Sequence, residues 1–204
     1  MCLLNLCSGT GSVSEPFRAN GWEIVEVDWD DRYGPTHVVD ITTWDYTVYP
    51  QDYFDVVWCS PDCTQYSRAR TTAKTPRNLA KADELAAACL RIVYYFQPKC
   101  WFLENPDSGV LKTRDVVRYL EFVRVDYCMY GRMYRKRTRL WANFTCGCPL
   151  LCDRSHLVDN KHLCSAQRGG SKHFKRRFTR DELHRLPEAL CQEIYEVCAE
   201  ACAA

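Results

Sequence analysis

The sequence has no long apolar run. No uninterrupted stretch reaches the roughly 18 to 20 residues that a membrane-spanning helix needs, and residues 1–7 are too short for a secretory signal. Internal repeats and low-complexity linkers are also missing. Since 47% of the 204 residues are apolar and 13% are aromatic, the chain can bury a sizeable core. We therefore expect a soluble intracellular protein of about one domain, and we exclude a disordered or fibrous chain.

Net charge is almost absent, at +1, but this value hides three regions. Residues 1–60 carry two basic and ten acidic side chains, for a charge of −8. Residues 61–180 carry 24 basic and ten acidic side chains (+14), and residues 181–204 carry one basic and six acidic side chains (−5). The basic middle region favours a polyanionic partner, although a solvated surface of lysine and arginine is an alternative interpretation.

Signs of disulfide bonding are missing despite the fourteen cysteines. Nothing marks the chain for secretion, and several cysteines lie inside apolar runs, where a thiol packs as a small apolar group. A Cys-x-x-Cys pair at a strand-to-helix turn is also missing, which disfavours a thiol redox protein. Most cysteines should be free thiols, and the question is whether one of them is a nucleophile.

Short apolar segments alternate with helical segments along much of the chain. We predict strands over residues 2–6, 23–28, 36–41, 54–59, 100–103, 122–129 and 139–144. Helices are predicted over residues 14–20, 78–96 and 113–120, and a last helix opens at Pro187. This order predicts an α/β fold with a mostly parallel sheet and helices on both faces, which binds ligands beyond the carboxyl ends of its strands.

Three strand ends carry residues that suit a nucleoside-like ligand. The first is a glycine-containing turn, Ser8-Gly9-Thr10-Gly11-Ser12, whose backbone a ligand can approach, although a plain tight turn is an equally good interpretation. No lysine follows it, so it is not a phosphate-binding lysine loop. Asp28 could accept hydrogen bonds from ribose hydroxyls, and Trp29 could stack on an adenine. Asp40 could accept from an exocyclic amine or could simply cap a helix.

Two further strand ends carry groups that suit covalent catalysis. Cys63 lies in a loop stiffened by Pro61, so we expect its thiol to be exposed and open to activation as a thiolate. Cys59, within the preceding strand, should be buried. Glu104 ends the fifth strand, and if partial burial raised its pKa it could act as a proton donor.

Six motifs, taken in order, resemble those of the cytosine-5 DNA methyltransferases. They are the turn at 8–12, Asp28-Trp29, Asp40-Ile41, the loop 61–67, Glu104-Asn105 and Arg137-Thr138-Arg139. The matches run from residue 5 to about residue 143, and residues 186–190 resemble the opening of the family's last helix. The resemblance implies a Rossmann-like, S-adenosylmethionine-dependent methyltransferase fold. The short chain is similar to versions carried by large DNA viruses.

The resemblance implies a role for each matching residue. Cys63 would attack carbon 6 of a cytosine while Glu104 donates a hydrogen bond or proton to nitrogen 3, so that carbon 5 takes a methyl group from S-adenosylmethionine. Asn105 would hold the cysteine loop, and Arg137 and Arg139 would fix the cytosine carbonyl and the active-site strand. The cofactor would lie against Leu6, Cys7, Ser8, Gly9, Thr10, Gly11, Ser12, Asp28, Trp29, Asp40, Ile41 and Ser60.

DNA is the partner that the resemblance implies. A stacked cytosine cannot reach such a pocket, so the enzyme would flip it out at a cost of roughly a few kcal/mol, which phosphate contacts offset. We expect those contacts from Arg68, Arg70, Lys74, Arg168, Lys172, Lys175, Arg176 and Arg177. We expect a monomer in the cytoplasm or nucleus, of a host cell if the protein is viral.

The sequence departs from the family pattern in three places. Asp62 stands where a second proline is usual, and its carboxylate would raise the pKa of the neighbouring thiol. Arg135 stands near the usual glutamine, with one extra residue before Lys136. The target-recognition region is reduced to residues 145–180, between a core at 1–144 and a closing helix at 181–204. Such a short segment predicts little sequence preference beside the cytosine.

The reduced segment also contains several thiols and imidazoles. Cys146, Cys148, Cys152 and Cys164, near His156 and His162, could bind zinc and fold a small lobe without a core. Their spacing is not that of a paired zinc knuckle, and ordinary thiols in a loop are the alternative. We assign no metal from the sequence and keep these four cysteines as zinc candidates.

Two other functions remain compatible with the sequence. One branch of the family methylates cytosine in transfer RNA with the same catalytic residues, so RNA is an alternative substrate. The other is a catalytically idle nucleic-acid-binding module, which Asp62 beside the thiol makes conceivable.

Overall fold

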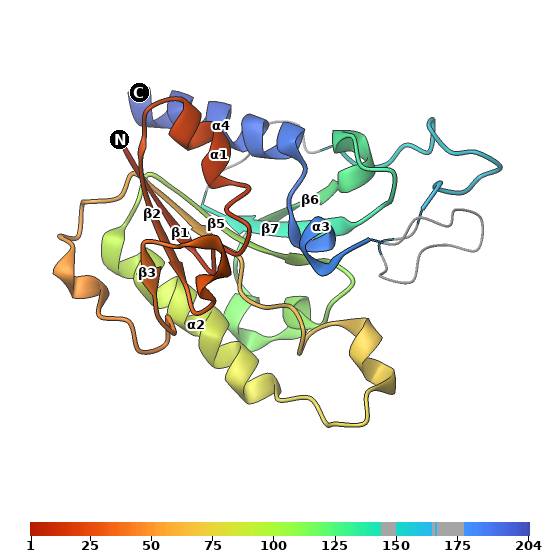
Figure 1. Cartoon of the computed structure of the whole chain (residues 1–204), viewed down its shortest axis with the longest axis horizontal. Helices are drawn as coiled ribbons and strands as arrows, with labels where there is room; N and C mark the ends of the chain where they lie inside the picture. Colours follow the sequence, from red (N-terminus) through yellow and green to blue (C-terminus); the bar gives the residue numbers. More distant parts are fainter. Residues whose placement is uncertain (144–149, 165, 167–177) are drawn as a thin grey trace.

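A seven-stranded sheet forms the centre of the molecule. The computed structural model describes residues 1–143, 150–164, 166 and 178–204 (Figure 1). The strand order is β3-β2-β1-β4-β5-β7-β6. Within this sheet, β7 runs in the opposite direction to the other six strands. The strands are β1 (Cys2–Leu6), β2 (Glu23–Asp28), β3 (His37–Val38), β4 (Val56–Cys59), β5 (Cys100–Pro106), β6 (Phe122–Asp126) and β7 (Arg137–Ala142).

Helices cover both faces of this sheet (Figure 1). They are α1 (Ser14–Ala19), α2 (Leu79–Phe96), α3 (Arg180–His184) and α4 (Glu188–Ala203). Alternate side chains of a central strand enter different cores: Leu3 packs with α1 and α4, whereas Leu4 packs with α2. All of β1 is therefore buried, as expected for a parallel strand covered on both sides. The α/β architecture predicted from the sequence is confirmed.

Short 3-10 turns connect these elements. They are η1 (Asp31–Tyr33), η2 (Tyr46–Val48), η3 (Arg68–Thr72), η4 (Leu111–Thr113), η5 (Asp115–Val117) and η6 (Tyr127–Tyr130). The predicted helix over residues 113–120 is wrong, because η4 and η5 occupy this region and Arg114 between them is extended. The Arg114 guanidinium forms an ion pair of 2.6 Å with Asp83 on α2, which holds Arg114 in place between the two turns. No described helix has the length and apolar character to cross a membrane.

Several predicted strand boundaries also needed correction. The strand expected over 36–41 contains only His37–Val38. The strand expected over 122–129 ends at Asp126, where η6 begins, and the strand expected over 139–144 begins at Arg137. Helix α3 was not predicted; its N-terminus is a capping box in which Thr179 and Glu182 exchange hydrogen bonds of 3.1 and 2.8 Å.

The antiparallel direction of β7 positions the site. The carboxyl ends of β1, β2, β4 and β5 share one edge of the sheet because these strands are parallel. An antiparallel neighbour begins where its parallel partners end. The start of β7, and Lys136 immediately before it, therefore lie at the edge near Glu104, which is buried close to the end of β5.

Candidate active site

A cleft of about 750 Å³ lies at the carboxyl edge of the sheet. This volume is within the range of roughly 300–1,000 Å³ that is typical of small-molecule sites. It is lined by many of the residues that the sequence singled out: Cys7, Ser8, Gly9, Thr10, Ser12, Asp28, Trp29, Asp40, Ile41, Ser60, Cys63 and Glu104. The parallel strands thus bring together residues that are far apart in the sequence.

The glycine-containing turn forms one end of the cleft. Cys7, Gly9 and Gly11 have positive φ angles of 56°, 50° and 66°, so the two glycines occupy positions where most side chains would be strained. The Gly9 amide donates a hydrogen bond of 2.8 Å to Asp28, whose other oxygen accepts from the Asp30 amide at 2.9 Å. Asp28 therefore shapes the turn, and it lines the cleft.

The side walls of this end are aromatic and apolar. Trp29 is 73% exposed and lines the cleft, so its indole is available for stacking. Ile41 also lines the cleft and is buried. Leu6 is fully buried in the core and does not line the cleft. Gly11 lines a small hollow on the neighbouring side of the turn.

Three predicted cofactor-binding side chains already have internal partners. The Ser12 hydroxyl accepts from the Leu186 amide at 3.1 Å, which ties the turn to the segment before α4. The Ser60 hydroxyl accepts from the Trp58 indole at 2.6 Å. One Asp40 oxygen accepts from the Thr42 amide and hydroxyl, and these hydrogen bonds lower the pKa of Asp40. The Asp40 carboxylate thus caps the turn at residues 41–43; no helix begins there, so the helix-cap alternative is wrong.

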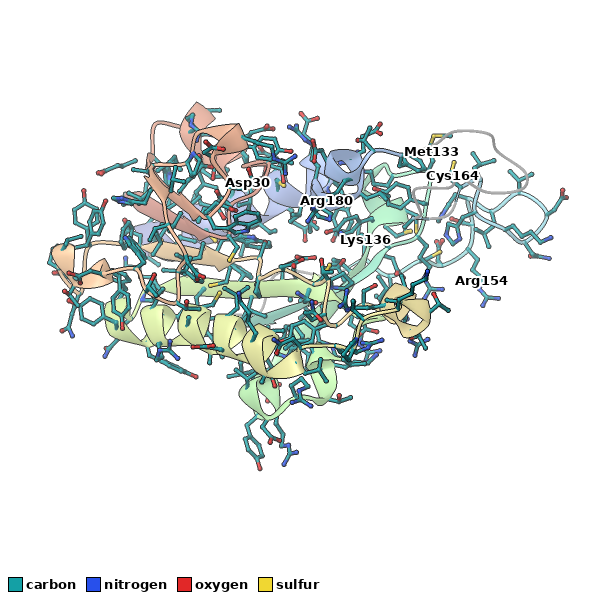
Figure 2. The ribbon with its side chains drawn as sticks, turned by 60° about the horizontal axis from the view of Figure 1, so that its bottom comes forward. Asp30, Met133, Lys136, Arg154, Cys164 and Arg180 are labelled. Carbon is teal, nitrogen blue, oxygen red and sulfur yellow. The ribbon has the colours of Figure 1, made fainter. Side chains whose placement is uncertain are left out.

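Helix α3 borders the mouth of the cleft. Arg180, Asp181 and His184 line it, and none of them was predicted as a cleft residue. Arg180 lies near Asp30 (Figure 2); hydrogen bonds from Arg32 and, more weakly, the Arg180 charge lower the pKa of Asp30. A hydrogen bond to Asp181 raises the pKa of Tyr33 in η1. These interactions connect the segment around η1 with helix α3 beside the mouth of the cleft.

The cysteine loop is held by the end of β5. The Asn105 side-chain amide donates a hydrogen bond of 2.9 Å to the Pro61 carbonyl, and the Tyr66 amide donates to the Cys63 carbonyl at 3.0 Å. The Asp62 carboxylate accepts hydrogen bonds from the Thr64 amide and hydroxyl at 3.0 and 2.6 Å. Cys63 is partly exposed, whereas Cys59 is fully buried as predicted.

Burial controls the ionisation of Cys63. Desolvation raises the pKa of its thiol to about 11, the nearby Lys136 charge lowers it, and the charges of Glu104 and Asp62 add smaller increases. The expected effect of Asp62 is thus present but is not the main one. At neutral pH only about one thiol in 10,000 would be ionised with such a pKa.

Glu104 lies deeper in the cleft and is buried. Desolvation raises the pKa of its carboxyl group, against the opposing effects of Lys136 and a hydrogen bond from Tyr127. The Tyr127 hydroxyl is 3.5 Å from the carboxylate. A raised pKa keeps a larger share of the group protonated near neutral pH, which is the state that can donate a proton.

Lys136 is the cation that Cys63 and Glu104 share. Its ammonium donates a hydrogen bond of 3.0 Å to the Leu183 carbonyl and lies 4.8 Å from the centroid of the Tyr127 ring. Figure 2 shows it near Arg180 in the middle of the molecule. Lys136 was not among the predicted site residues; its only signal in the sequence is its position beside Arg137 in a basic run.

Arg137 and Arg139 lie on the other face of the sheet. In the pairing of β5 with β7, Arg139 is opposite Asn105, whereas Glu104 is opposite Leu140. Arg137 pairs with the buried Asp126 at 2.6 Å. Arg139 pairs with Asp107 at 2.8 Å and stacks 3.7 Å above the Phe122 ring. The structure therefore does not bring either guanidinium to the cleft, and both brace the strands around it.

The residues predicted to bind nucleic acid fall into two groups. Arg68 and Lys74 are exposed around η3, beside the cysteine loop. Arg70 instead donates to the Thr75 hydroxyl and the Pro76 carbonyl at 2.8 and 3.2 Å, so it braces this segment. The remaining residues, Arg168, Lys172, Lys175, Arg176 and Arg177, lie outside the described residues.

Two of the four cysteines predicted as zinc candidates, Cys152 and Cys164, lie among the described residues. Cys146 and Cys148 lie outside the described residues. Cys164 is buried in the core beside Tyr134, and its amide donates to the Met133 carbonyl at 3.2 Å. Cys152 instead lies near His156 and His162. No disulfide joins the cysteines of the described part of the chain.

Solved structures with a similar fold are methyltransferases. The Entamoeba histolytica methyltransferase EhMeth matches with a TM-score of 0.59 and 11% identity over 99% of this chain and 95% of that chain. The S. pombe Dnmt2 methyltransferase matches with a TM-score of 0.50 and 11% identity, over 74% of this chain and 52% of that chain. A putative DNA modification methyltransferase encoded within an E. coli prophage matches with a TM-score of 0.54 and 16% identity, over 70% of this chain and 46% of that chain. The chain thus has the Rossmann-like fold of S-adenosylmethionine-dependent methyltransferases.

Sequence similarity narrows this class. No protein-family model matches the chain. The curated protein "Probable DNA (cytosine-5)-methyltransferase" of Frog virus 3 (isolate Goorha) is 33% identical to this chain. The alignment covers 97% of this chain and 100% of that protein. At this identity and coverage, the chain belongs to the cytosine-5 DNA methyltransferase family. The resemblance carried by the six sequence motifs is confirmed.

Proposed function

We propose that this protein transfers a methyl group from S-adenosylmethionine to carbon 5 of cytosine in DNA, through a covalent bond between Cys63 and carbon 6. The observation that carries the proposal is the meeting of Cys63 and Glu104 around Lys136 in one cleft, whose other end is the glycine-containing turn. A nucleophile, a carboxyl group with a raised pKa and a nucleoside-like site are thereby within reach of one another.

The cleft fits S-adenosylmethionine at its glycine end. Trp29 offers an exposed indole for the adenine, and Asp28 offers lone pairs for the ribose hydroxyls. The space beside the Gly9 backbone is open, because a Cβ there would meet no atom within 4 Å, so a ligand can approach the turn closely. When bound, the cofactor supplies an electrophilic methyl group to carbon 5 of the base.

Cys63 and Glu104 prepare the base. The Cys63 thiolate forms a bond to carbon 6, and the electron pair of the carbon 5–carbon 6 double bond moves through the ring to nitrogen 3, which takes the proton of Glu104. Carbon 5 of the resulting enamine is nucleophilic. After methylation, loss of the carbon 5 proton to water expels the Cys63 sulfur and restores the carbon 5–carbon 6 double bond, and nitrogen 3 returns its proton to Glu104. Lys136 stabilises the thiolate beforehand and is placed to bind the cytosine carbonyl.

A basic surface beside the cysteine loop supports a DNA substrate. Arg68 and Lys74 are exposed there, where phosphates next to a flipped cytosine would pass. Incubation of the protein with S-adenosylmethionine and unmethylated DNA, followed by sequencing of 5-methylcytosine, tests this proposal. Parallel incorporation of labelled methyl groups into transfer RNA gives the control, and transfer confined to RNA would overturn the assignment to DNA.

Methylation should depend little on the bases around the cytosine. The segment between the core and the closing helix is only 145–180, so it can bury little area against DNA and read few base edges. On random-sequence DNA we expect a preference of one or two positions next to the methylated cytosine. A site with four or more defined bases would contradict this expectation.

Replacing Lys136 with methionine should make Cys63 less reactive. The change removes the positive charge that lowers the pKa of the thiol, so the pKa should rise above about 11. We expect roughly 3- to 10-fold slower alkylation of Cys63 at pH 8, the effect of about one charge interaction near a protein surface. Peptide mass spectrometry after timed iodoacetamide treatment measures this rate. Lys99→Met, at an exposed site away from the cleft, should alkylate at the wild-type rate.

A further inference from the structure

A second group of metal-binding side chains lies outside the cleft. One ligand atom from each of Cys128, Cys152, His156 and His162 can be chosen so that all four lie within 4.8 Å of one another. The Cys152 sulfur is 3.4 Å from Nε2 of His162 and 4.0 Å from Nε2 of His156. Two thiols and two imidazoles thus converge on one point.

The donor set and its spacing are those of a tetrahedral zinc site. With Zn–S near 2.3 Å and Zn–N near 2.0 Å, ligand atoms in a tetrahedron are about 3.3 to 3.8 Å apart. The two distances from the Cys152 sulfur are within a few tenths of an ångström of this range. Two cysteines and two histidines also suit zinc better than calcium or magnesium, which prefer oxygen ligands.

The cluster joins two parts of the chain. Cys128 belongs to η6, in the connection between β6 and β7, and the other three residues belong to the segment 150–164. Buried Asp126 stands at the junction: its carboxylate accepts from the Cys152 amide at 3.0 Å, and its own amide donates to the Leu150 carbonyl at 3.0 Å. These hydrogen bonds hold the backbone at Cys152, and the Cys152 sulfur in turn lies near Nε2 of both histidines.

The segment 150–164 has little apolar core of its own. Leu150, Leu151, Val158 and Leu163 are exposed, and Arg154 points away from the body of the molecule (Figure 2). A segment of this kind cannot bury enough apolar surface to fix its fold, and small lobes commonly use a metal for this purpose. All four positions of the cluster are protein ligands, which is typical of a structural rather than a catalytic zinc.

We propose that Cys128, Cys152, His156 and His162 bind one structural Zn²⁺, which fastens the segment 150–164 to the connection between β6 and β7. On binding, each cysteine releases its thiol proton to solvent and ligates as a thiolate, and each histidine ligates as a neutral imidazole. The same connection leads into Lys136 at the start of β7, so the metal stabilises the hairpin beside the cleft. Of the four cysteines that the sequence offered as zinc candidates, this ligand set keeps only Cys152, and it adds Cys128, His156 and His162.

Metal analysis of the purified full-length protein tests the proposal. After preparation with a thiol reductant and without chelator, elemental mass spectrometry should find about one zinc per chain. Cys128→Ser and His162→Ala should each lose most of this zinc. Cys202→Ser, which changes a partly buried thiol on α4, should retain it. The double variant Cys146→Ser/Cys148→Ser should also retain it.

Cobalt substitution reads the ligand set directly. The Co²⁺ form should show the intense visible bands of tetrahedral cobalt and a thiolate-to-metal charge-transfer band, and both should be largely lost in Cys128→Ser, which retains little metal. The proposal is overturned by a metal-free wild-type protein, by a Cys128–Cys152 disulfide under reducing conditions, or by zinc that depends on Cys146 and Cys148 instead of Cys128. None of these readouts uses methyl transfer, so they remain valid whatever the reaction of the cleft.

Discussion

Replacing Cys63 with serine is expected to lower methyl transfer to cytosine by at least about 1,000-fold, the scale of loss that follows removal of a covalent nucleophile. A serine hydroxyl has nearly the volume of the thiol but ionises far less readily, so the bond to carbon 6 would not form. The loop should keep its shape, because the Asn105 amide holds the Pro61 carbonyl and not the sulfur. Transfer of labelled methyl groups to unmethylated DNA measures this loss.

The matched control changes a cysteine away from the cleft. Cys202→Ser lies on α4 and should methylate DNA at the wild-type rate. Equal loss in both variants would indicate a general sensitivity to cysteine replacement. Activity within tenfold of wild type in Cys63→Ser would exclude Cys63 as the nucleophile.

Replacing Glu104 with glutamine should lower the rate by roughly 100- to 10,000-fold, the usual contribution of a positioned acid. The amide keeps the size of the buried carboxyl group but cannot protonate nitrogen 3. Circular dichroism and thermal unfolding should remain close to those of the wild type. Single-turnover methylation measures the loss.

The pH profile separates this role from a structural one. Burial raises the pKa of Glu104, and the protonated form is the active one, so its contribution falls as pH rises through that pKa. Ionisation of Cys63 has the opposite sign, because the thiolate is active and increases up to a pH of about 11. The wild-type rate should therefore have a rising and a falling limb, whereas Glu104→Gln should retain only the rising limb. A profile of unchanged shape would contradict the proton transfer.

Much of the cleft could be predicted because it depends on local features. The glycine-containing turn, Asp28, Cys63 and Glu104 each follow a short apolar strand, and parallel strands deliver their carboxyl ends to one edge. The position of each residue relative to its own strand was therefore enough to expect them in one site. Their distances and partners required the structure.

The positions of the cations could not be predicted in this way. Which side chains of β7 share a face with Glu104 depends on the pairing of β5 with β7, and a shift by one residue exchanges the faces. The sequence pointed to Arg137 and Arg139, whereas the structure brings Lys136 to the cleft. The basic run around Lys136 contains no signal that distinguishes these alternatives.

Long-range contacts set the composition of the metal cluster. Cys128 is separated from Cys152 by more than twenty residues and was outside the segment that drew attention to zinc. Hydrogen bonds of Asp126 to both Leu150 and Cys152 bring the two regions together. Such a junction between a strand end and a later loop has no short sequence pattern.

Covalent trapping tests the proposed role of Cys63 most directly. A DNA duplex with 5-fluorocytosine at a methylated position blocks the last step, because fluorine cannot leave carbon 5 as the proton does. With S-adenosylmethionine present, we expect a stable adduct that denaturing electrophoresis resolves and that peptide mass spectrometry assigns to Cys63. Methylated product without any adduct, or an adduct on another cysteine, would contradict the mechanism.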